Sequence, residues 1–469
     1  MGKRRLRAIL GALALLGVGA GLGAGPATAT AGDTAADTAV YQGTIDGAAY
    51  RAEVPGNWNG TLILWSHAAY RFGFVPADIE LTNQPVTEQW LLDHGYAVAA
   101  SKYNPVSGWV VQQALHDQLE LLGWFREHVG TPRRTVAEGT SMGGLVSTLL
   151  AERHPGLLDG VVSLCEYQAG SVASWNLGLD FGFVVKALLP TAGDLQLAHV
   201  SDPDANWAIA RDAVLAALGT PQGRARLALA GAIADLPPWS SPLVPQPTDL
   251  DTQLSQQAGY YGTLLRFNVG GDRVKLEQLA GGNPSSNLGV DYRAQLARSS
   301  QRVLAEQAYA AAGLDLDADL DRLAAAPRVA PDSAALNYQA RYGTPAGTTP
   351  APVLTMHTVG DGLAPPENQR QYADQVGRNG DPARLRQVFV PRGGHCTFTA
   401  SEEIVALQAL LSRLDTGQWP STDPAVLTGA AGEFAAQYQT VHLPTGDYQS
   451  VTPAFTGFAP GPYLRPYPS

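Results

Sequence analysis

Three side chains of this 469-residue chain have the types that nucleophilic catalysis by a serine requires. Ser141 lies in the G-x-S-x-G pentapeptide "GTSMG", Asp361 in the turn "VGDG", and His395 in the loop "RGGHC". A serine hydroxyl is a poor nucleophile at neutral pH, so it needs a base that takes its proton and a carboxylate that orients the base. We therefore predict that Ser141 attacks a carbonyl carbon, with His395 as the base and Asp361 as its partner.

The residues around Ser141 predict a sharp turn between a strand and a helix. The segment "RTVAEGTS" at 134–141 is typical of a short buried strand, and "MGGLVSTLLAERHPG" at 142–156 is typical of a helix closed by Pro-Gly. Such a turn lifts the serine hydroxyl above the sheet, while the glycines allow a tight backbone turn and close helix packing. The free N–H groups at the helix start would face an anion formed at Ser141.

Strands and helices alternate on both sides of this turn. Predicted strands lie at 61–68, 96–103, 158–166, 352–362 and 385–396, and predicted helices lie at 110–130, 364–377 and 401–414. This alternation predicts an α/β fold with a mostly parallel, doubly wound sheet. Ser141, Asp361 and His395 all follow such strands, and the carboxyl ends of parallel strands are where functional side chains gather.

The alternation is interrupted at 167–349, where helical stretches and proline-rich breaks predominate. So long a connection must be structured in its own right, and we interpret it as a helical cap inserted into a core of residues 40–166 and 350–416. Its aromatic residues are expected mainly in the core of the cap, and they are Trp175, Trp207, Trp239, Tyr260, Tyr261 and Phe267. Residues 417–469 form an extension rich in proline, glycine and aromatic residues.

The first 31 residues have the features of a secretory signal peptide. Basic residues precede an apolar run to about residue 25, and small residues at A-x-A spacing follow. We therefore expect a secreted, extracellular protein. No later stretch is long and apolar enough to span a membrane. The formal net charge of −11 argues against nucleic acid or an anionic membrane as partner.

Cys165 and Cys396 are the two cysteines of the chain. An even pair in an exported chain predicts a disulfide, which would tie the loop of His395 to the strand beside the serine turn. The histidines are scattered and the cysteines are few, so the sequence offers no zinc-binding framework. We expect neither a metal nor an organic cofactor.

The chain resembles the α/β-hydrolases over residues 40–166 and 350–416. The resemblance is carried by "LILWSHAAY", "GTSMGG", "VGDGLAPPENQ" and "GGHC". It implies that the N–H of Met142 is one donor to the oxyanion and that the loop after the third strand supplies the other, which we assign to Ala69. That loop usually contains His-Gly in the family, whereas this chain has His67-Ala68.

The cysteine directly after the predicted catalytic histidine is similar to the tannase and feruloyl esterase group. In that group the partner cysteine precedes the serine, where this chain has Thr140. The similarity is therefore limited to the His395-Cys396 step, and the substrates of that group are not carried over.

We expect this chain to hydrolyse a small carboxylic ester through an acyl-enzyme on Ser141. Two alternatives stay open. One is an amidase or peptidase of the same fold, such as an aminopeptidase in which Glu138 and Glu166 bind the substrate. The other is a non-catalytic binding protein, which an intact set of catalytic residues argues against.

Four further residues have roles that the sequence leaves open. Glu166 follows a predicted strand and is an alternative to Asp361 as the catalytic acid. Tyr70 and Glu166 are candidates for contact with the substrate. His67 is expected to support the oxyanion loop, and His357, in the middle of a strand, is expected to be a core histidine.

Overall fold

The computed structural model describes residues 38–70, 75–443 and 446–467. The signal peptide predicted at 1–31 lies outside the described residues. Within the described part of the chain, none of the helices combines the length and the apolar composition that a membrane span requires.

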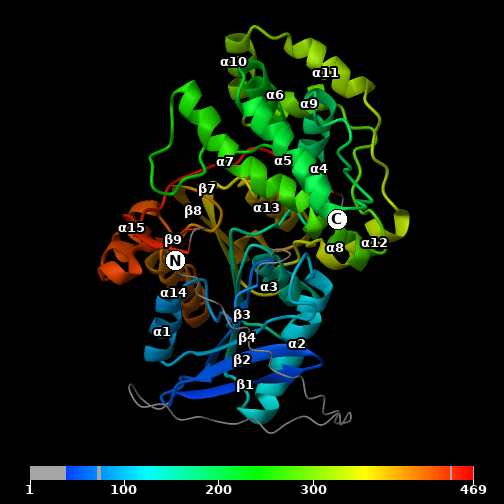
Figure 1. Cartoon of the computed structure of the whole chain (residues 1–469). Coiled ribbons are helices and arrows are strands. Elements are labelled where there is room, and N and C mark those ends of the chain that lie inside the picture. The colour runs from blue at the N-terminus through cyan, green and yellow to red at the C-terminus, as the bar shows by residue number, and fades with distance from the viewer. Residues whose placement is uncertain (1–37, 71–74, 444–445, 468–469) are drawn as a thin grey trace, which may run out of the picture.

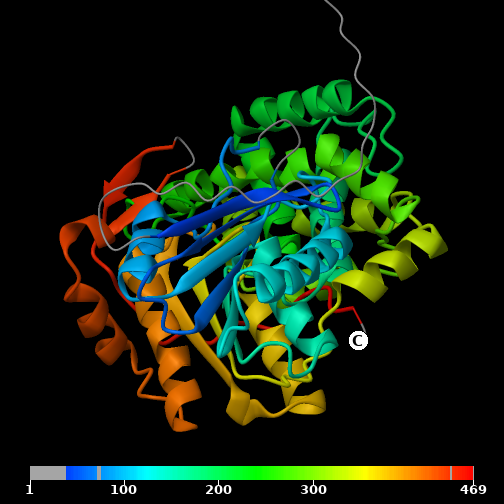
Figure 2. The ribbon, with the colours of Figure 1, turned by 90° about the horizontal axis from the view of Figure 1, so that it is seen from below.

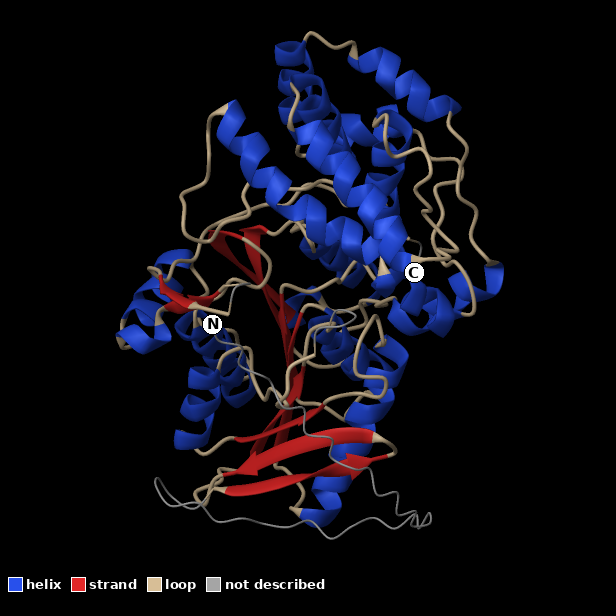
Figure 3. Cartoon of the chain, in the orientation of Figure 1, coloured by secondary structure: helices blue, strands red, loops and turns tan. Residues whose placement is uncertain are grey.

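An eight-stranded sheet with the order β1-β2-β4-β3-β5-β6-β7-β8 forms the centre of the molecule (Figures 1 and 3). β1 and β2 form an antiparallel hairpin, β2 pairs antiparallel with β4, and all pairs from β4 to β8 are parallel. This topology, with Ser141 between β5 and α3, confirms the predicted α/β-hydrolase fold. The strands, including the separate β9–β10 pair, are β1 (Ala39–Ile45), β2 (Ala48–Val54), β3 (Thr61–Ser66), β4 (Ala97–Ser101), β5 (Arg134–Thr140), β6 (Gly160–Leu164), β7 (Val353–Gly360), β8 (Leu385–Gly393), β9 (Thr440–His442) and β10 (Tyr448–Ser450).

Helices cover both faces of the sheet, as Figure 2 shows from below. α2, α3 and α13 share a hydrophobic core with one face, and α1, α14 and α15 share a core with the other. β3 and β6 are therefore buried along their whole length, which is why both are nearly continuous apolar runs. These elements are α1 (Pro85–Asp93), α2 (Val111–His128), α3 (Met142–Arg153), α13 (Glu367–Asn379), α14 (Ala400–Thr416), α15 (Pro424–Gly432) and the short 3₁₀ helices η1 (Pro382–Arg384) and η2 (Ala436–Tyr438).

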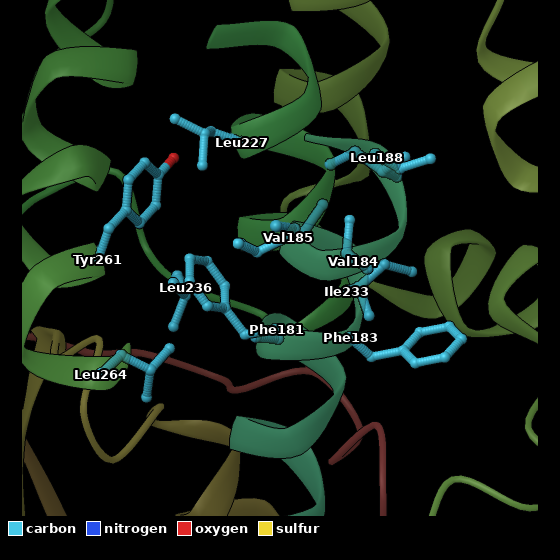
Figure 4. Packing of buried hydrophobic residues seen from close by; sticks show 14 of the residues in the cluster. Phe181, Phe183, Val184, Val185, Leu188, Leu227, Ile233, Leu236, Tyr261 and Leu264 are labelled. Atoms are coloured by element: carbon cyan, nitrogen blue, oxygen red, sulfur yellow. The ribbon is translucent and has the colours of Figure 1, made fainter. Parts of the chain in front are cut away.

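The helical insertion, which we define as residues 167–349, lies over the carboxyl edge of the sheet and has a hydrophobic core of its own. α4 runs through this core, and Figure 4 shows its residue Phe181 on the side that faces Tyr261 and Leu264 of α7. The helices of the insertion are α4 (Ser171–Leu188), α5 (Pro203–Leu218), α6 (Pro221–Ile233), α7 (Leu250–Val269), α8 (Gly271–Ala280), α9 (Tyr292–Arg298), α10 (Arg302–Ala312), α11 (Leu316–Ala325) and α12 (Ser333–Gly343).

The C-terminal segment, which we define as residues 451–467, extends from the sheet to the helical insertion. Thr456 forms an isolated antiparallel bridge with β8 at the edge of the sheet. Further along, Tyr463 is buried in the core of the insertion, and Arg465 forms an ion pair with the buried Asp180 of α4. The described part of this segment therefore ends against the insertion, close to the label C in Figure 1.

Candidate active site

Ser141, His395 and Asp361 form one hydrogen-bonded chain at the carboxyl ends of β5, β8 and β7. His395 Nε2 lies 3.0 Å from Ser141 Oγ, and His395 Nδ1 lies 2.6 Å from Asp361 Oδ2. Ser141 and His395 are 254 positions apart, so it is the parallel sheet that brings them together. One imidazole nitrogen faces the hydroxyl and the other faces a carboxylate, which is the arrangement that general-base activation of a serine needs.

Ser141 occupies a strained position in the turn between β5 and α3. Its φ of 56° and ψ of −121° are unusual for an L-residue, and its N–H donates to the carbonyl oxygen of Leu164 at 2.8 Å. Gly143 permits the turn, because a Cβ at that position would lie 1.9 Å from the carbonyl oxygen of Ser66. The turn therefore packs directly against the end of β3, and glycine at 143 is a steric requirement.

The two predicted oxyanion donors belong to elements that meet beside Ser141. Met142 is the first residue of α3, and the N–H groups of a helix's first turn have no acceptor within the helix. Ala69 lies in the loop that follows β3, whose end at Ser66 contacts Gly143. Partial positive charge at the start of α3 would favour an oxyanion at this place.

His67 supports the start of this loop. Its imidazole lies between the rings of Tyr70 and Tyr103, with both ring centroids 4.0 Å away, and its Nδ1 is 2.6 Å from the carbonyl oxygen of Ala68. Burial lowers the pKa of His67 to about 4, so the ring is neutral near pH 7. The Tyr70 side chain is buried, and its hydroxyl donates to Glu80 at 2.8 Å. Its contacts with His67 and Glu80 therefore hold the loop after β3 in place.

The carboxylate of Asp361 is held on several sides within its turn. Asp361 Oδ1 accepts the N–H groups of Leu363 and Ala364, both at 2.9 Å. His357 Nε2 lies 2.7 Å from the carbonyl oxygen of Ala364 and 3.5 Å from Asp361 Oδ2. These contacts leave Oδ2 directed toward His395.

Glu166, the alternative acid, has Gln369 and His357 as its side-chain partners and not His395. It is fully buried; its Oε1 accepts a hydrogen bond from Gln369 Nε2, and its Oε2 lies 3.8 Å from His357 Nδ1. Burial raises the pKa of Glu166. Burial acts to lower the pKa of His357, but the carboxylates of Glu166 and Asp361 raise it above its ordinary value. The carboxylate that contacts His395 is therefore that of Asp361.

Cys165 and Cys396 form the predicted disulfide, with Cα atoms 5.2 Å apart and 231 positions between them. Cys165 follows β6, the neighbour of β5, and Cys396 follows His395 directly. The bond therefore ties the loop of His395 to the strand next to the one that ends at Ser141. Within the described ranges, the group with the spacing of metal ligands consists of these two cysteines and His395, and the disulfide removes both thiolates from it.

Tyr260 of the helical insertion also reaches the site. Its hydroxyl donates to the carbonyl oxygen of Gly360 and accepts the N–H of Gly394 at 2.9 Å. These bonds span 100 and 134 positions of the chain. No local pattern marks such a contact, so the sequence places Tyr260 among the aromatic residues of the insertion core and does not indicate its contact with the site.

A narrow cleft lies between the helical insertion and the turn of Asp361. Its volume is about 20 Å³, which is room for about one water molecule. Gly362, the residue after Asp361, lines it, and the ring of Tyr167 in its wall lies 6.1 Å from the imidazole of His395. The wall is largely apolar and includes Tyr167, Leu177, Leu236, Leu264, Leu363 and Tyr463.

A larger hollow of about 430 Å³ lies away from this site, among residues 133, 134, 159, 414 and 415. Arg134 begins β5, whose other end carries Ser141, so the length of a strand separates the two places. The hollow is lined mainly by arginine and aspartate side chains, and Arg134 forms an ion pair with Asp415 there.

Comparisons with known proteins identify a family and a relative of this chain. Residues 28–295 match the Tannase-like family of unknown function (DUF6351). The chain is 31% identical over 426 residues to an o-phthalyl amidase from Xanthobacter agilis. The matched region covers 82% of this chain and 89% of the amidase.

Two solved esterases are similar at lower identity. An esterase from Aspergillus oryzae is 13% identical with a TM-score of 0.38. The match covers 82% of this chain and 81% of the esterase chain. The rice cell wall degrading esterase LipA from Xanthomonas oryzae is 13% identical with a TM-score of 0.35. The match covers 81% of this chain and 89% of the LipA chain.

Proposed function

The chain belongs to the tannase-like family, and from that premise and the site geometry we propose that it is a serine hydrolase that cleaves carboxylic esters through an acyl-enzyme on Ser141. The observation that supports the proposal is the continuous hydrogen-bonded chain from Ser141 through His395 to Asp361. The positive φ at the turn supports it further, because that conformation exposes a nucleophilic side chain above the sheet.

In the proposed reaction, His395 Nε2 accepts the proton of Ser141 as Oγ attacks the carbonyl carbon. The tetrahedral oxyanion is stabilised by the N–H groups of Met142 and Ala69. His395 then donates the proton to the leaving group, and the carbon–heteroatom bond breaks. A water molecule, deprotonated by His395, attacks the acyl-enzyme and releases the acid. Asp361 holds the imidazole in one orientation and stabilises its cationic form throughout.

Cleavage of amides is the second candidate, because the relative from Xanthobacter agilis is named an amidase. The same acyl-enzyme chemistry serves both bonds, but an amine leaves only after it has received a proton. An aminopeptidase that used Glu138 and Glu166 is disfavoured. Both side chains are buried, at 3% and 0% exposure, and burial raises the pKa of Glu138 to about 8. Neither is available to hold a substrate ammonium group.

The test compares the purified chain with Ser141→Ala on p-nitrophenyl esters and on p-nitroanilides of the same acids. Serine-dependent turnover of esters alone would support an esterase, and comparable turnover of anilides would support an amidase. A fluorophosphonate probe should label the wild-type chain at Ser141 and leave Ser141→Ala unlabelled. Absence of both labelling and turnover in the folded wild-type chain would overturn the proposal.

We also propose that the protein is exported. The basic start and apolar run of residues 1–31 support this, as does the disulfide, since such bonds persist in oxidising compartments. N-terminal sequencing of the chain recovered outside expressing cells should begin near residue 30. Recovery only inside the cell, with Met1 retained, would contradict export.

A further inference from the structure

The hydroxyl of Tyr260 connects the two loops that carry the base and the acid. Tyr260 is on α7 of the helical insertion, whereas both loops belong to the sheet core. Its hydroxyl donates to the carbonyl oxygen of Gly360, the residue before Asp361. It accepts the N–H of Gly394, the residue before His395, at 2.9 Å. One oxygen atom thus contacts the backbone next to each partner of the His395–Asp361 hydrogen bond.

The ring of Tyr260 fits closely between these loops. The side chain is 5% exposed, and a Cβ added at Gly362 would lie 2.4 Å from the ring. The hydroxyl is also 3.0 Å from the carbonyl oxygen of Trp239, which lies on the insertion. Burial, followed by the charge of Asp361, raises the pKa of Tyr260 well above its ordinary value, so the hydroxyl stays protonated and can donate.

We propose that Tyr260 is a positioning residue through which the helical insertion sets the spacing between His395 and Asp361. This inference rests on the proposed function. Without the hydroxyl, the Gly360 carbonyl and the Gly394 N–H lose a shared buried partner and keep only their longer direct bond of 3.3 Å, so the spacing between the two loops is less tightly fixed. Small displacements of this kind lower the rate of the chemical step more than they weaken substrate binding.

The adjacent Tyr261 provides a matched control for Tyr260. Tyr261 is also buried on α7, but its hydroxyl donates to Gln257 Oε1 within the same helix, at 2.8 Å. Both Tyr260→Phe and Tyr261→Phe remove one buried hydroxyl from the same element. A purely structural role would therefore lower the melting temperature in both variants and leave their activities similar.

We expect kcat of Tyr260→Phe on a p-nitrophenyl ester to fall about 10- to 100-fold with KM near that of wild type. Tyr261→Phe should keep the wild-type kcat. Equal kcat values in the two variants would overturn the inference.

A second readout does not depend on turnover. The proton between His395 Nδ1 and Asp361 Oδ2 should give a low-field NMR resonance, and Tyr260→Phe should shift or broaden it while Tyr261→Phe leaves it in place. An unchanged resonance in Tyr260→Phe would overturn the inference even if the chain lacked ester hydrolase activity. Failure of the proposed function itself would appear instead as a wild-type Ser141 that no fluorophosphonate labels.

A second, independent observation concerns Tyr463 of the C-terminal segment. Tyr463 is 3% exposed and forms part of the wall of the cleft beside Asp361. The cleft has room for only about one water molecule, so a substituent larger than a methyl group must displace part of its wall. Among the residues that line the cleft, Tyr463 is the one that the C-terminal segment contributes.

We infer that the cleft is a subsite for one apolar substituent of the scissile carbonyl and that Tyr463 limits the size of that substituent. This inference also rests on the proposed function. Its matched control is the next residue, Leu464, which is 2% exposed in the core of the insertion and does not line the cleft.

The test measures kcat/KM for two ester series, one with a constant leaving group and increasing acyl length, the other with acetyl as the acyl group and bulkier leaving groups. In the series whose varied group enters the cleft, Tyr463→Ala should raise the ratio of kcat/KM for the bulky ester to kcat/KM for the small ester about 10- to 100-fold relative to wild type. Leu464→Ala should keep the wild-type preference while losing stability. An unchanged profile of Tyr463→Ala in both series, with Ser141-dependent turnover intact, would overturn the inference.

Discussion

The sheet core and the helical insertion contribute to the site in different ways. The core supplies Ser141, Asp361 and His395 from the ends of three parallel strands, and the disulfide adds a covalent tie. The insertion supplies a hydroxyl between two loops and most of the wall of a cleft. On the proposed function, the core determines which reaction is possible, while the insertion adjusts how accurately the groups are held and which substrate fits.

The sharpest test of this division compares two buried aspartates, one from each region. Asp361→Asn should lower kcat about 10⁴-fold, because an amide no longer holds His395 in the productive tautomer. Asp319 of α11 is 4% exposed and pairs with Arg226 and Arg322. Asp319→Asn should lower the melting temperature and leave kcat near the wild-type value. Similar kcat losses in the two variants would contradict the view that the core, and not the insertion, determines which reaction is possible.

Removing the disulfide should affect both stability and activity. For Cys165→Ser with Cys396→Ser, we expect the free energy of unfolding to fall by about 2–5 kcal/mol, because the bond closes a long loop of the unfolded chain. We also expect kcat to fall about 10-fold, because the loop of His395 is less constrained. Denaturant titration and ester kinetics measure the two effects. Reduction of the wild-type chain should reproduce them, and a fully active double variant would contradict the positioning role.

Where the C-terminal segment meets the insertion, the largest effect on stability is expected at the ion pair of Arg465 with Asp180. Asp180 is fully buried and also accepts a hydrogen bond from Tyr292 at 2.8 Å. Arg465→Gln leaves a buried carboxylate without its cation, so the free energy of unfolding should fall by about 3 kcal/mol. Combining it with Asp180→Asn should recover part of that loss. Additive losses in the double variant would show that the pair is not coupled.

The effect that develops most gradually, with pH, is expected at a carboxyl pair where the insertion meets the core. Asp235 accepts hydrogen bonds from Ser299 Oγ and Ser300 N, and Ser300 Oγ donates to Glu367 of α13 at 3.1 Å. Burial raises the pKa of Asp235 from 3.8 to about 7. Burial and the charge of Asp235 raise the pKa of Glu367 well above its ordinary value.

Between pH 3.8 and about 7 the folded chain holds a proton at Asp235 that the unfolded chain has released. Stability must therefore fall as pH rises through this window, by at most about 1.4 kcal/mol per pH unit. Asp235→Asn should flatten this dependence, so its melting temperature relative to wild type should increase from pH 4 to pH 7. Parallel curves for the two proteins would mean that Asp235 is ionised in the folded chain.

Much of the core could be predicted because its signals are local. The strand-to-helix turn at Ser141, the turn at Asp361 and the loop at His395 are each visible in a few residues, and a parallel sheet places strand ends side by side. The disulfide followed from the number of cysteines and the expected compartment. The fold class rested on the alternation of strands and helices.

The contribution of the insertion could not be predicted, for physical reasons. α4 is buried on nearly all sides, so it has no polar stripe from which an amphipathic helix is recognised. Tyr260 bonds to residues 100 and 134 positions away, and Tyr463 of the C-terminal segment lines a cleft with residues of α4 and α7; no periodicity marks such contacts. The sequence shows aromatic residues in these regions, but only the three-dimensional packing distinguishes those that touch the site from those that do not.

The position of the insertion in the sheet matters for protein engineering. β6 and β7 are adjacent and parallel, so the insertion leaves the core at the carboxyl end of β6 and returns to it at the amino end of β7, a strand length away. Two junctions at the ends of neighbouring strands define the segment that an exchange with another family member would replace. The C-terminal segment makes a third connection, because Tyr463 and Arg465 are bound within the insertion. A chimaera should therefore take residues 451–467 from the same donor as the insertion. Otherwise the cleft would be lined by insertion residues of one protein and by the C-terminal segment of another.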